Sequence, residues 1–117
     1  MPEIESSPTL YKVISSDDWR AAETQGEFTG VGIDLDDAFI HLSSQSQVVE
    51  TVGRYFVGQE GLLLVAVDAS KLGDTLRWEP SRNGDLFPHV YGSISMEAVI
   101  RTDKLPVNRD GSHRFPF

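Results

Sequence analysis

Two short segments of the sequence set a histidine into a pattern that alternates between apolar and polar residues. In residues 38–44 (AFIHLSS), His41 would share one face of a strand with an aromatic ring and a hydroxyl, because strand side chains alternate between faces. Residues 87–91 (FPHVY) repeat the pattern around His89, which would share a face with two aromatic rings. The two histidine-bearing faces predict a ligand site.

His41 is the strongest candidate for chemistry in this chain. An imidazole can hydrogen-bond a ribose hydroxyl or a carbonyl, and it can exchange a proton near neutral pH. The alternative is a structural imidazole that satisfies a neighbouring backbone group. The same two interpretations apply to His89, since aromatic surroundings also suit a packed histidine. His113 lies in a polar segment near the end of the sequence, where we expect it to be solvated.

Glu79 is the most suggestive carboxylate, because it directly follows Trp78 at the end of a short predicted strand. A carboxylate beside a large ring can lose hydration, which raises its pKa and suits acid–base work. The alternative is an exposed edge glutamate paired with a neighbouring arginine. Lys12 is a basic residue within another predicted strand, where a lysine side chain commonly faces solvent.

The sequence does not indicate metal or thiol chemistry. It has no cysteine, which excludes a disulfide, a thiolate nucleophile and a cysteine-ligated metal. The histidines lack the spacing of metal ligands, so no metal is expected. Asp34, Asp36 and Asp37 have calcium-like spacing but lack the distal glutamate of an EF-hand loop, and we expect them to form a solvated turn.

Composition limits the partners that the chain can have. The 117 residues carry 10 basic and 18 acidic side chains and a net charge of −8, which argues against long nucleic acid and against an anionic membrane surface. No apolar run approaches the ~20 residues that cross a bilayer. The acidic first residues lack the features of a signal peptide, so we expect a cytoplasmic protein.

Patterns of apolar and turn residues predict one α+β domain over residues 1–117, with its core at about 9–105. A polar lead-in (1–8) and a polar tail (108–117) are expected to flank this core at the surface. Two helices are expected, one that Ser15 or Ser16 caps and Gly26 follows, and one over 44–56. The continuous apolar run over 61–68 predicts a central strand that is buried on both faces. Further strands are expected over 9–14, 38–44, 76–79, 87–91 and 99–105.

The hydrophobic pattern also predicts which side chains face the core. In the first helix these are Trp19 and Ala22. In the strand over 38–44 and in the second helix they are Ala38, Ile40, Leu42, Val48, Val49, Val52, Tyr55 and Phe56.

A series of motifs in a fixed order resembles the bacterial domain-of-unknown-function 952 family over roughly residues 9–105. The motifs are LYKVI (10–14), WxxA (19–22), FIHLS (39–43), RYFxG (54–58), LLLVAVD (62–68), RWE (77–79) and FPHVYG (87–92). The resemblance implies an ADP-ribosyltransferase-like α+β fold. In such a fold a split, strongly bent β-sheet with two main helices forms a cleft, and this cleft holds NAD in the enzymatic relatives.

A fainter similarity links residues 40–43, 52–54 and 64–68 to RNA 2′-phosphotransferases, which use NAD to remove a phosphate from spliced tRNA and share that fold. Those enzymes have a histidine where this chain has Lys12, and they carry an additional N-terminal domain and a basic surface for RNA. The tRNA activity is therefore not carried over to this short acidic chain. Glu79 is a candidate for the late catalytic glutamate of toxin-like transferases.

The resemblance implies a small-molecule-binding domain that binds or processes NAD or another ADP-ribose-type nucleotide. Such a domain would be an NAD-dependent transferase, a glycohydrolase-like enzyme, or a binding module that has lost the chemistry. His41 would bond the ribose on the nicotinamide side, and Glu79 would orient a hydroxyl or stabilise positive charge. The implied ligand-binding residues are Tyr11, Lys12, Ser43, Trp78, Phe87, His89 and Tyr91. The alternative is a non-catalytic protein-interaction module that uses the aromatic strand faces.

Overall fold

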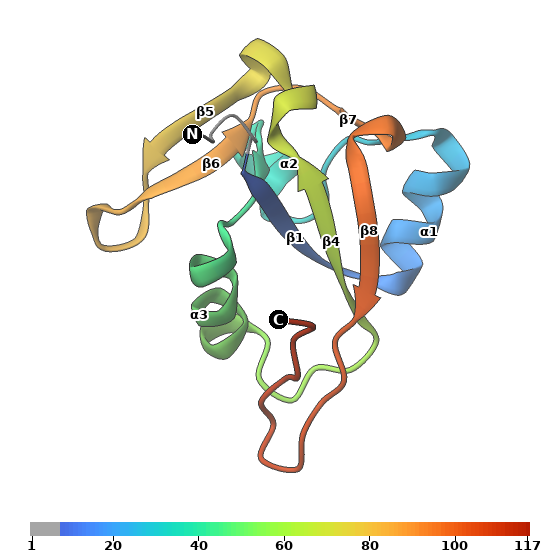
Figure 1. Ribbon diagram of the computed structural model, residues 1–117, viewed down its shortest axis with the longest axis vertical. Coiled ribbons are helices and arrows are strands. Elements are labelled where there is room, and N and C mark those ends of the chain that lie inside the picture. Colours follow the sequence, from blue (N-terminus) through green and yellow to red (C-terminus); the bar gives the residue numbers. More distant parts are fainter. Residues whose placement is uncertain (1–7) are drawn as a thin grey trace, which may run out of the picture.

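A computed structural model describes residues 8–117 (Figure 1). The predicted lead-in over residues 1–8 therefore lies outside the described residues, apart from Pro8. The helices are α1 (Ser16–Gln25), α2 (Ile33–Asp37) and α3 (Gln45–Tyr55). The strands are β1 (Thr9–Ser15), β2 (Glu27–Phe28), β3 (Ile40–His41), β4 (Leu62–Asp68), β5 (Leu76–Pro80), β6 (Leu86–Val90), β7 (Ile94–Ser95) and β8 (Val99–Lys104). Short 3₁₀ turns lie at Ala69–Lys71, Gly73–Thr75, Arg82–Gly84 and Met96–Ala98. The fold is a mixed α and β fold with antiparallel sheets.

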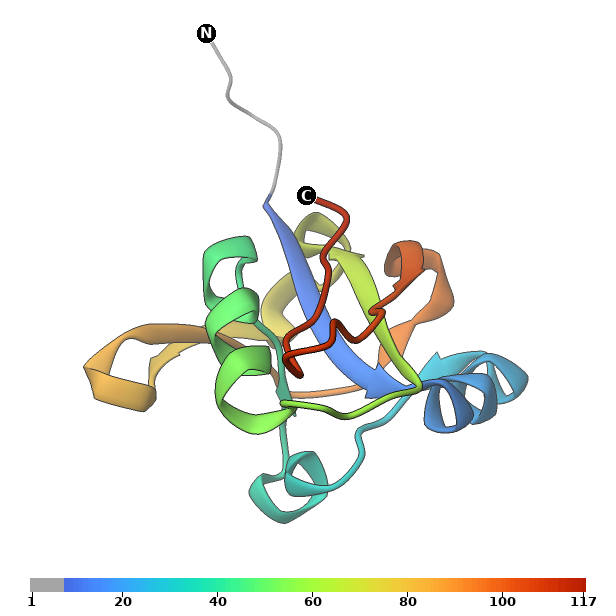
Figure 2. The same ribbon diagram turned by 90° about the horizontal axis from the view of Figure 1, so that it is seen from below.

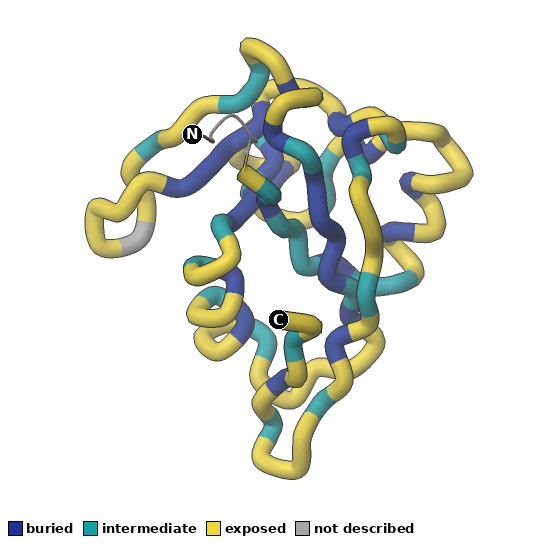
Figure 3. The backbone as a smooth tube through the Cα atoms, viewed as in Figure 1, coloured by how far each residue is buried: buried dark blue, intermediate teal, exposed yellow. Residues whose placement is uncertain are grey.

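Strand β4 is the central strand of the sheet β1-β4-β8, as its apolar run predicts. It is buried on both faces because its side chains alternate between two core clusters. Leu62 and Leu64 pack in the cluster beside α3, whereas Val65 and Val67 pack in the cluster that contains Trp19 of α1. Figure 2 shows α3 and α1 on opposite sides of the β1–β4 pair, and in Figure 3 the residues of β4 are coloured mainly as buried.

A second sheet, in the order β3-β6-β5, carries both sequence-predicted histidines. His41 of β3 lies directly opposite His89 of β6 in the antiparallel register. One bridge joins this sheet to β1: the Tyr11 N–H donates to the Ser43 carbonyl at 2.8 Å, and the Ser43 N–H donates to the Tyr11 carbonyl at 2.9 Å. The histidine-bearing strands are therefore fixed against the edge of the first sheet.

The segment before β3 differs from its prediction as a solvated turn. It contains α2, a third helix, and Ala38 ends that helix in the left-handed conformation at φ 65°. Regular pairing of the predicted strand over 38–44 is therefore reduced to β3 and the bridge at Ser43. Ala38 is exposed, so the prediction that it faces the core is wrong, whereas Ile40 and Leu42 are buried as predicted.

Both predicted helices begin at the serines that the sequence indicates. The Ser15 hydroxyl accepts the Asp18 N–H at the start of α1, and Gly26 ends the helix in the left-handed conformation at φ 87°. In α3, Ser44 and Gln47 form a reciprocal capping box. Trp19 and Ala22 in α1 are buried as predicted.

The buried stripe of α3 is narrower than predicted. Val48 and Val52 are buried and Phe56 is half-buried, but Val49 and Tyr55 are exposed. Val49 lies about 100° around the helix from Val48, which turns it away from the sheet. Tyr55 stands at the end of the helix, where its ring faces a pocket rather than the core.

The C-terminal tail is anchored more firmly than a segment that only follows the surface. Val107 pairs with His113, and the Gly58 N–H donates to the Gly111 carbonyl at 2.8 Å. His113 is buried, with its Nε2 2.8 Å from the Gln59 carbonyl oxygen, so the prediction that it is solvated is wrong. The pairing with Val107 holds its ring against the protein.

Candidate functional site

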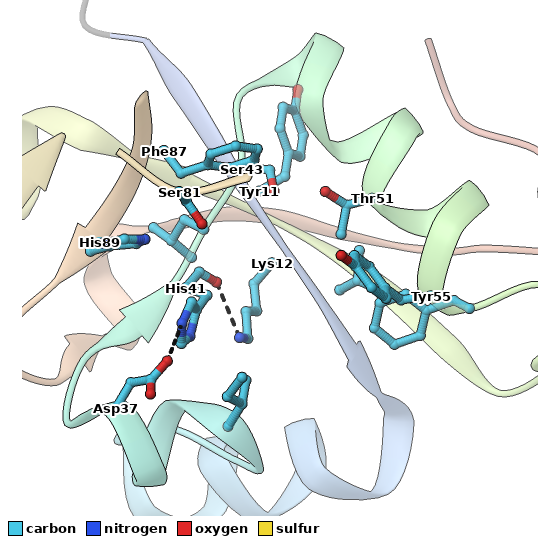
Figure 4. Close-up of a pocket in the computed structure, with 14 residues that line it drawn as sticks. Tyr11, Lys12, Asp37, His41, Ser43, Thr51, Tyr55, Ser81, Phe87 and His89 are labelled. Carbon is cyan, nitrogen blue, oxygen red and sulfur yellow. Dashed lines mark hydrogen bonds and ion pairs between the residues drawn. The ribbon is translucent and has the colours of Figure 1, made fainter. Parts of the chain in front are cut away.

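A pocket of about 470 Å³ opens between the histidine-bearing strands, β1 and α3 (Figure 4). This volume is within the range of small-molecule sites, roughly 300–1,000 Å³. The side chains of α3 that line it include Thr51 and Tyr55. The sequence-predicted site residues that line it are Tyr11, Lys12, His41, Ser43, Phe87 and His89.

The structure places the other three predicted site residues outside the pocket lining. Glu79 and Tyr91 lie behind His89. Glu79 contacts the His89 ring, and the Tyr91 hydroxyl donates to Glu79. Trp78 lies on the opposite face of β5 from Glu79, because successive strand residues alternate, and it pairs with Pro88. The structure therefore brings only His41 and His89 of this group to the pocket wall, while Glu79 and Tyr91 lie behind His89 and Trp78 lies apart.

Asp34, expected in a solvated turn, is a buried hub beneath the pocket, with only 1% of its side chain exposed. Its Oδ1 accepts the His41 backbone N–H at 3.0 Å and lies 2.6 Å from His41 Nδ1. Lys12 Nζ donates to Oδ1 at 3.0 Å and lies 2.8 Å from Oδ2, and Oδ2 accepts the Val31 N–H at 3.2 Å. This carboxylate therefore joins α2, β1 and β3.

The two charges at this hub shift each other's protonation. Burial by itself would raise the pKa of Asp34, but the hydrogen bonds from His41 and the Lys12 ammonium outweigh it and lower that pKa from 3.8 to about 2. Burial lowers the pKa of Lys12 below its ordinary value, and the charge of Asp34 offsets part of this effect. Lys12 also donates to the His41 carbonyl at 3.1 Å, so its ammonium is committed to the hub rather than to the pocket.

Both ring nitrogens of His41 contact carboxylates. Nδ1 is held by Asp34, and Nε2 lies 3.0 Å from Oδ2 of Asp37, a contact drawn in Figure 4. A ligand would reach Nε2 by displacing the half-exposed Asp37 side chain. The predicted catalytic role of His41 stays a prediction.

His89 is oriented by a second carboxylate. Its Nδ1 lies 2.8 Å from Oε1 of Glu79, and the same oxygen accepts the Tyr91 hydroxyl at 2.8 Å. The hydrogen bond with His89 lowers the pKa of Glu79 most, and the hydrogen bond from Tyr91 lowers it further. The bond to Glu79 in turn raises the pKa of Tyr91. The expectation that a neighbouring ring raises the Glu79 pKa is wrong, because the carboxylate faces hydrogen-bond donors and not Trp78.

Phe39 connects the two histidine groups and was not among the predicted site residues. Its ring centroid lies 4.2 Å from that of His89, 4.7 Å from that of His41 and 5.1 Å from that of Tyr91. The alternation of residues 38–44 already placed Phe39 on the face of His41. Asp34 and Asp37 were expected in a solvated turn and not at the site, although an acidic run directly before a histidine strand is a signal that could have indicated them.

We expect His41→Asn to lower the free energy of unfolding by about 1 kcal/mol. Asparagine keeps a donor near the position of Nδ1, so the hydrogen bond to Asp34 can persist, while the partly exposed contact with Asp37 is lost. Chemical denaturation of both proteins measures the difference. A loss above about 3 kcal/mol would show that the imidazole is part of the core.

Two structural absences among the described residues concern membranes and metals. No helix in this part of the chain is long and apolar enough to cross a membrane. Within the same residues, no group of three or more histidine, aspartate or glutamate side chains is arranged to hold a metal ion.

The chain matches one protein family. The profile of the family described as "Protein of unknown function (DUF952)" matches residues 13–102. The crystal structure of protein CC0527 from Caulobacter crescentus is 43% identical, with a TM-score of 0.86 over 91% of this chain and 93% of that chain. Its solution NMR structure is 45% identical, with a TM-score of 0.80 over 88% and 89% of the two chains. No curated protein matches this chain. Because the family profile covers more than half of the sequence, the chain belongs to the DUF952 family.

Proposed function

We propose that this domain binds a nucleotide-type small molecule of the NAD or ADP-ribose class in the pocket between β1, β3, β6 and α3. The observation that carries the proposal is that His41 and His89, each held by a carboxylate, stand 5.3 Å apart between ring centroids at one pocket wall. The aromatic residues Tyr11, Tyr55 and Phe87 line the same pocket. Flat apolar surface beside a few oriented polar groups suits a ligand that joins a base to a sugar.

The sheet arrangement supports an ADP-ribosyltransferase-like fold as part of this proposal. Two three-stranded antiparallel sheets meet at the Tyr11–Ser43 bridge, which is the kind of junction that a split sheet requires. Tyr11 and Ser43 both line the pocket, so the ligand would lie at this junction. The ionised carboxylates around the histidines would stabilise positive charge at a ribose during transfer or hydrolysis.

Ligand binding should be visible as stabilisation of the folded protein. NAD, ADP-ribose, cyclic nucleotides and 2′-phosphorylated nucleotides would be compared by thermal shift and by calorimetric titration. A ligand at 100 times its Kd adds about 2.7 kcal/mol, which corresponds to roughly 10 °C in a domain of this size. No shift with any of these compounds would contradict the proposal.

A pair of exposed residues in α2 provides a matched control for the location of the ligand. Ile33 lines the pocket, whereas Leu35 is equally exposed but lies outside its lining. Ile33→Glu should weaken binding of an anionic nucleotide about tenfold, equivalent to ~1.4 kcal/mol, because it sets a carboxylate beside the ligand. Leu35→Glu should leave binding unchanged. Equal effects of the two substitutions would place the ligand elsewhere.

The second candidate function is a protein-interaction module. Three large apolar side chains are exposed on and next to the β5–β6 hairpin: Trp78 by 42%, Leu86 by 51% and Tyr91 by 41%. Exposed apolar side chains that gather in one region are typical of a protein-binding surface. A protein partner whose binding is lost in Trp78→Ser and persists in Ile33→Glu, together with no nucleotide binding, would favour this second function.

A further inference from the structure

His89 lines the pocket with a ring that the protein orients through only one of its two nitrogens. Its side chain is only 6% exposed, and its Nδ1 contacts Glu79. Among the residues that the structure describes, Nε2 of His89 has no hydrogen-bond partner. The close-up in Figure 4 shows the His89 ring directed into the pocket with a nitrogen at its pocket end. A ring nitrogen that is held in a fixed orientation at a pocket wall is placed to bond a group that enters the pocket.

The contact with Glu79 decides which nitrogen carries the proton. An ionised carboxylate only accepts hydrogen bonds, so Nδ1 of a neutral His89 is the protonated nitrogen and Nε2 presents a lone pair. The Tyr91 hydroxyl donates to the same oxygen of Glu79 and fixes that carboxylate, while Phe39 stacks on the imidazole face. His41 differs, because carboxylates engage both of its ring nitrogens.

The charges around this position restrict what can bind there. Lys12 is the basic residue of the pocket lining, and its ammonium is paired with Asp34. Asp37 and Glu79 add negative charge close to the two imidazoles. Arg77 lies opposite His89 in the strand register, but its guanidinium lies over the Tyr91 ring, outside the pocket lining. Within the described pocket lining a phosphate at Nε2 would therefore find Asp37 and an ammonium that is already paired, whereas a neutral donor would find a hydrogen-bond acceptor.

We propose that Nε2 of His89 is the recognition atom at the inner end of the pocket. It accepts a hydrogen bond from a hydroxyl or N–H group of the ligand, such as a ribose hydroxyl or a carboxamide, and the phosphates lie toward the mouth. Glu79 and Tyr91 are positioning residues that set the tautomer and orientation of His89. This inference rests on the proposed small-molecule function and names the chemical group that the site recognises.

Nitrogen NMR of the histidine side chains tests the inference on the unmodified protein. Free His89 should show one tautomer, with hydrogen on Nδ1 and a bare Nε2. Saturating NAD should change the Nε2 resonance of His89 and leave the resonances of His113, which lies outside the pocket lining, nearly unchanged. Glu79→Gln should mix the two tautomers, because a side-chain amide can accept from or donate to Nδ1. A His89 whose hydrogen is on Nε2 in the free protein would overturn the inference.

Two substitutions separate recognition from packing. His89→Asn keeps an amide near the position of Nδ1 for Glu79 and removes the group at Nε2, so NAD affinity should fall at least tenfold. His89→Gln places an amide near Nε2 and should recover part of that loss. His113→Asn is the matched control, because His113 lies outside the pocket lining, and the NAD affinity of its folded form should change less than threefold.

The outcomes distinguish this inference from the proposed function. Binding of NAD with no response at His89 Nε2, or with equal affinity in His89→Asn, overturns the inference and leaves the nucleotide pocket intact. Failure of NAD and ADP-ribose to bind the unmodified protein overturns the proposed function, and the inference with it. If His89→Asn does not fold, the NMR response of the unmodified protein decides the inference.

Discussion

Asp34→Asn is expected to lower the free energy of unfolding by about 3–5 kcal/mol, because it leaves the Lys12 ammonium buried without its counter-charge. Lys12 is 11% exposed in its side chain and Asp34 is 1% exposed, so water cannot replace the lost carboxylate without local opening. The amide also removes an acceptor from His41 Nδ1 or from the Val31 N–H. Chemical denaturation of both proteins measures the change.

Two further variants determine whether the buried charge causes the loss. Asp36→Asn makes the same chemical change at an exposed position two residues away in α2, and it should cost less than about 0.5 kcal/mol. Lys12→Met in the Asp34→Asn background removes the unpaired ammonium and should recover a large part of the stability. Equal losses of stability in Asp34→Asn and Asp36→Asn would contradict the claim that the buried ion pair with Lys12 causes the loss.

The same carboxylate predicts how acid affects the fold. The pKa of Asp34 is lowered from 3.8 to about 2 in the folded protein, so the unfolded chain binds its proton more readily. The stabilisation is therefore complete above about pH 4 and disappears as the pH falls toward 2, with a size of about 2 kcal/mol. Denaturation between pH 2 and 5 should show a shallower dependence on pH in Asp34→Asn than in the unmodified protein.

Local sequence signals were sufficient for the main elements of this fold. The apolar run of β4 and the serine caps of α1 and α3 act over a few residues, so they are readable without tertiary information. The exposed position of Tyr55 depends on where α3 extends past the sheet, and hydrophobic spacing does not contain that distance. The short helix α2 was missed because its acidic sequence also suits a turn, and its tie to β1 and β3 through Asp34 is a long-range contact.

The site was predictable where strand alternation determines it. Alternation placed Phe87, His89 and Tyr91 on one face, and the structure joins His89 and Tyr91 through Glu79. It could not show that β3 pairs with β6, which is the contact that brings His41 beside His89. Nor could it show that the carboxylates of α2 engage the His41 ring, since that depends on how the segment before β3 turns back over the strand.

Leu64→Ala is expected to lower the free energy of unfolding by about 2–5 kcal/mol, because it opens a cavity in the smaller of the two core clusters. Leu64 is 1% exposed at the centre of β4, and it packs in the cluster that holds α3 through Val48 and Val52. Such a loss is a large part of the roughly 5–15 kcal/mol that stabilises a domain. Chemical denaturation gives the total change, with Ile100→Ala on the exposed face of β8 as the matched strand control, expected to cost less than about 0.5 kcal/mol.

The position of Leu64 also predicts where the structure loosens. Its cluster supports α3, which carries Thr51 and Tyr55 on the pocket wall, whereas α1 packs in the other cluster. Amide hydrogen exchange in Leu64→Ala should therefore accelerate more in α3 than in α1, and nucleotide affinity should fall because part of the pocket wall is less often in place. A loss of stability spread evenly over both helices, with unchanged exchange in α3, would show that the two clusters act as one core and that the pocket does not depend on this side of β4.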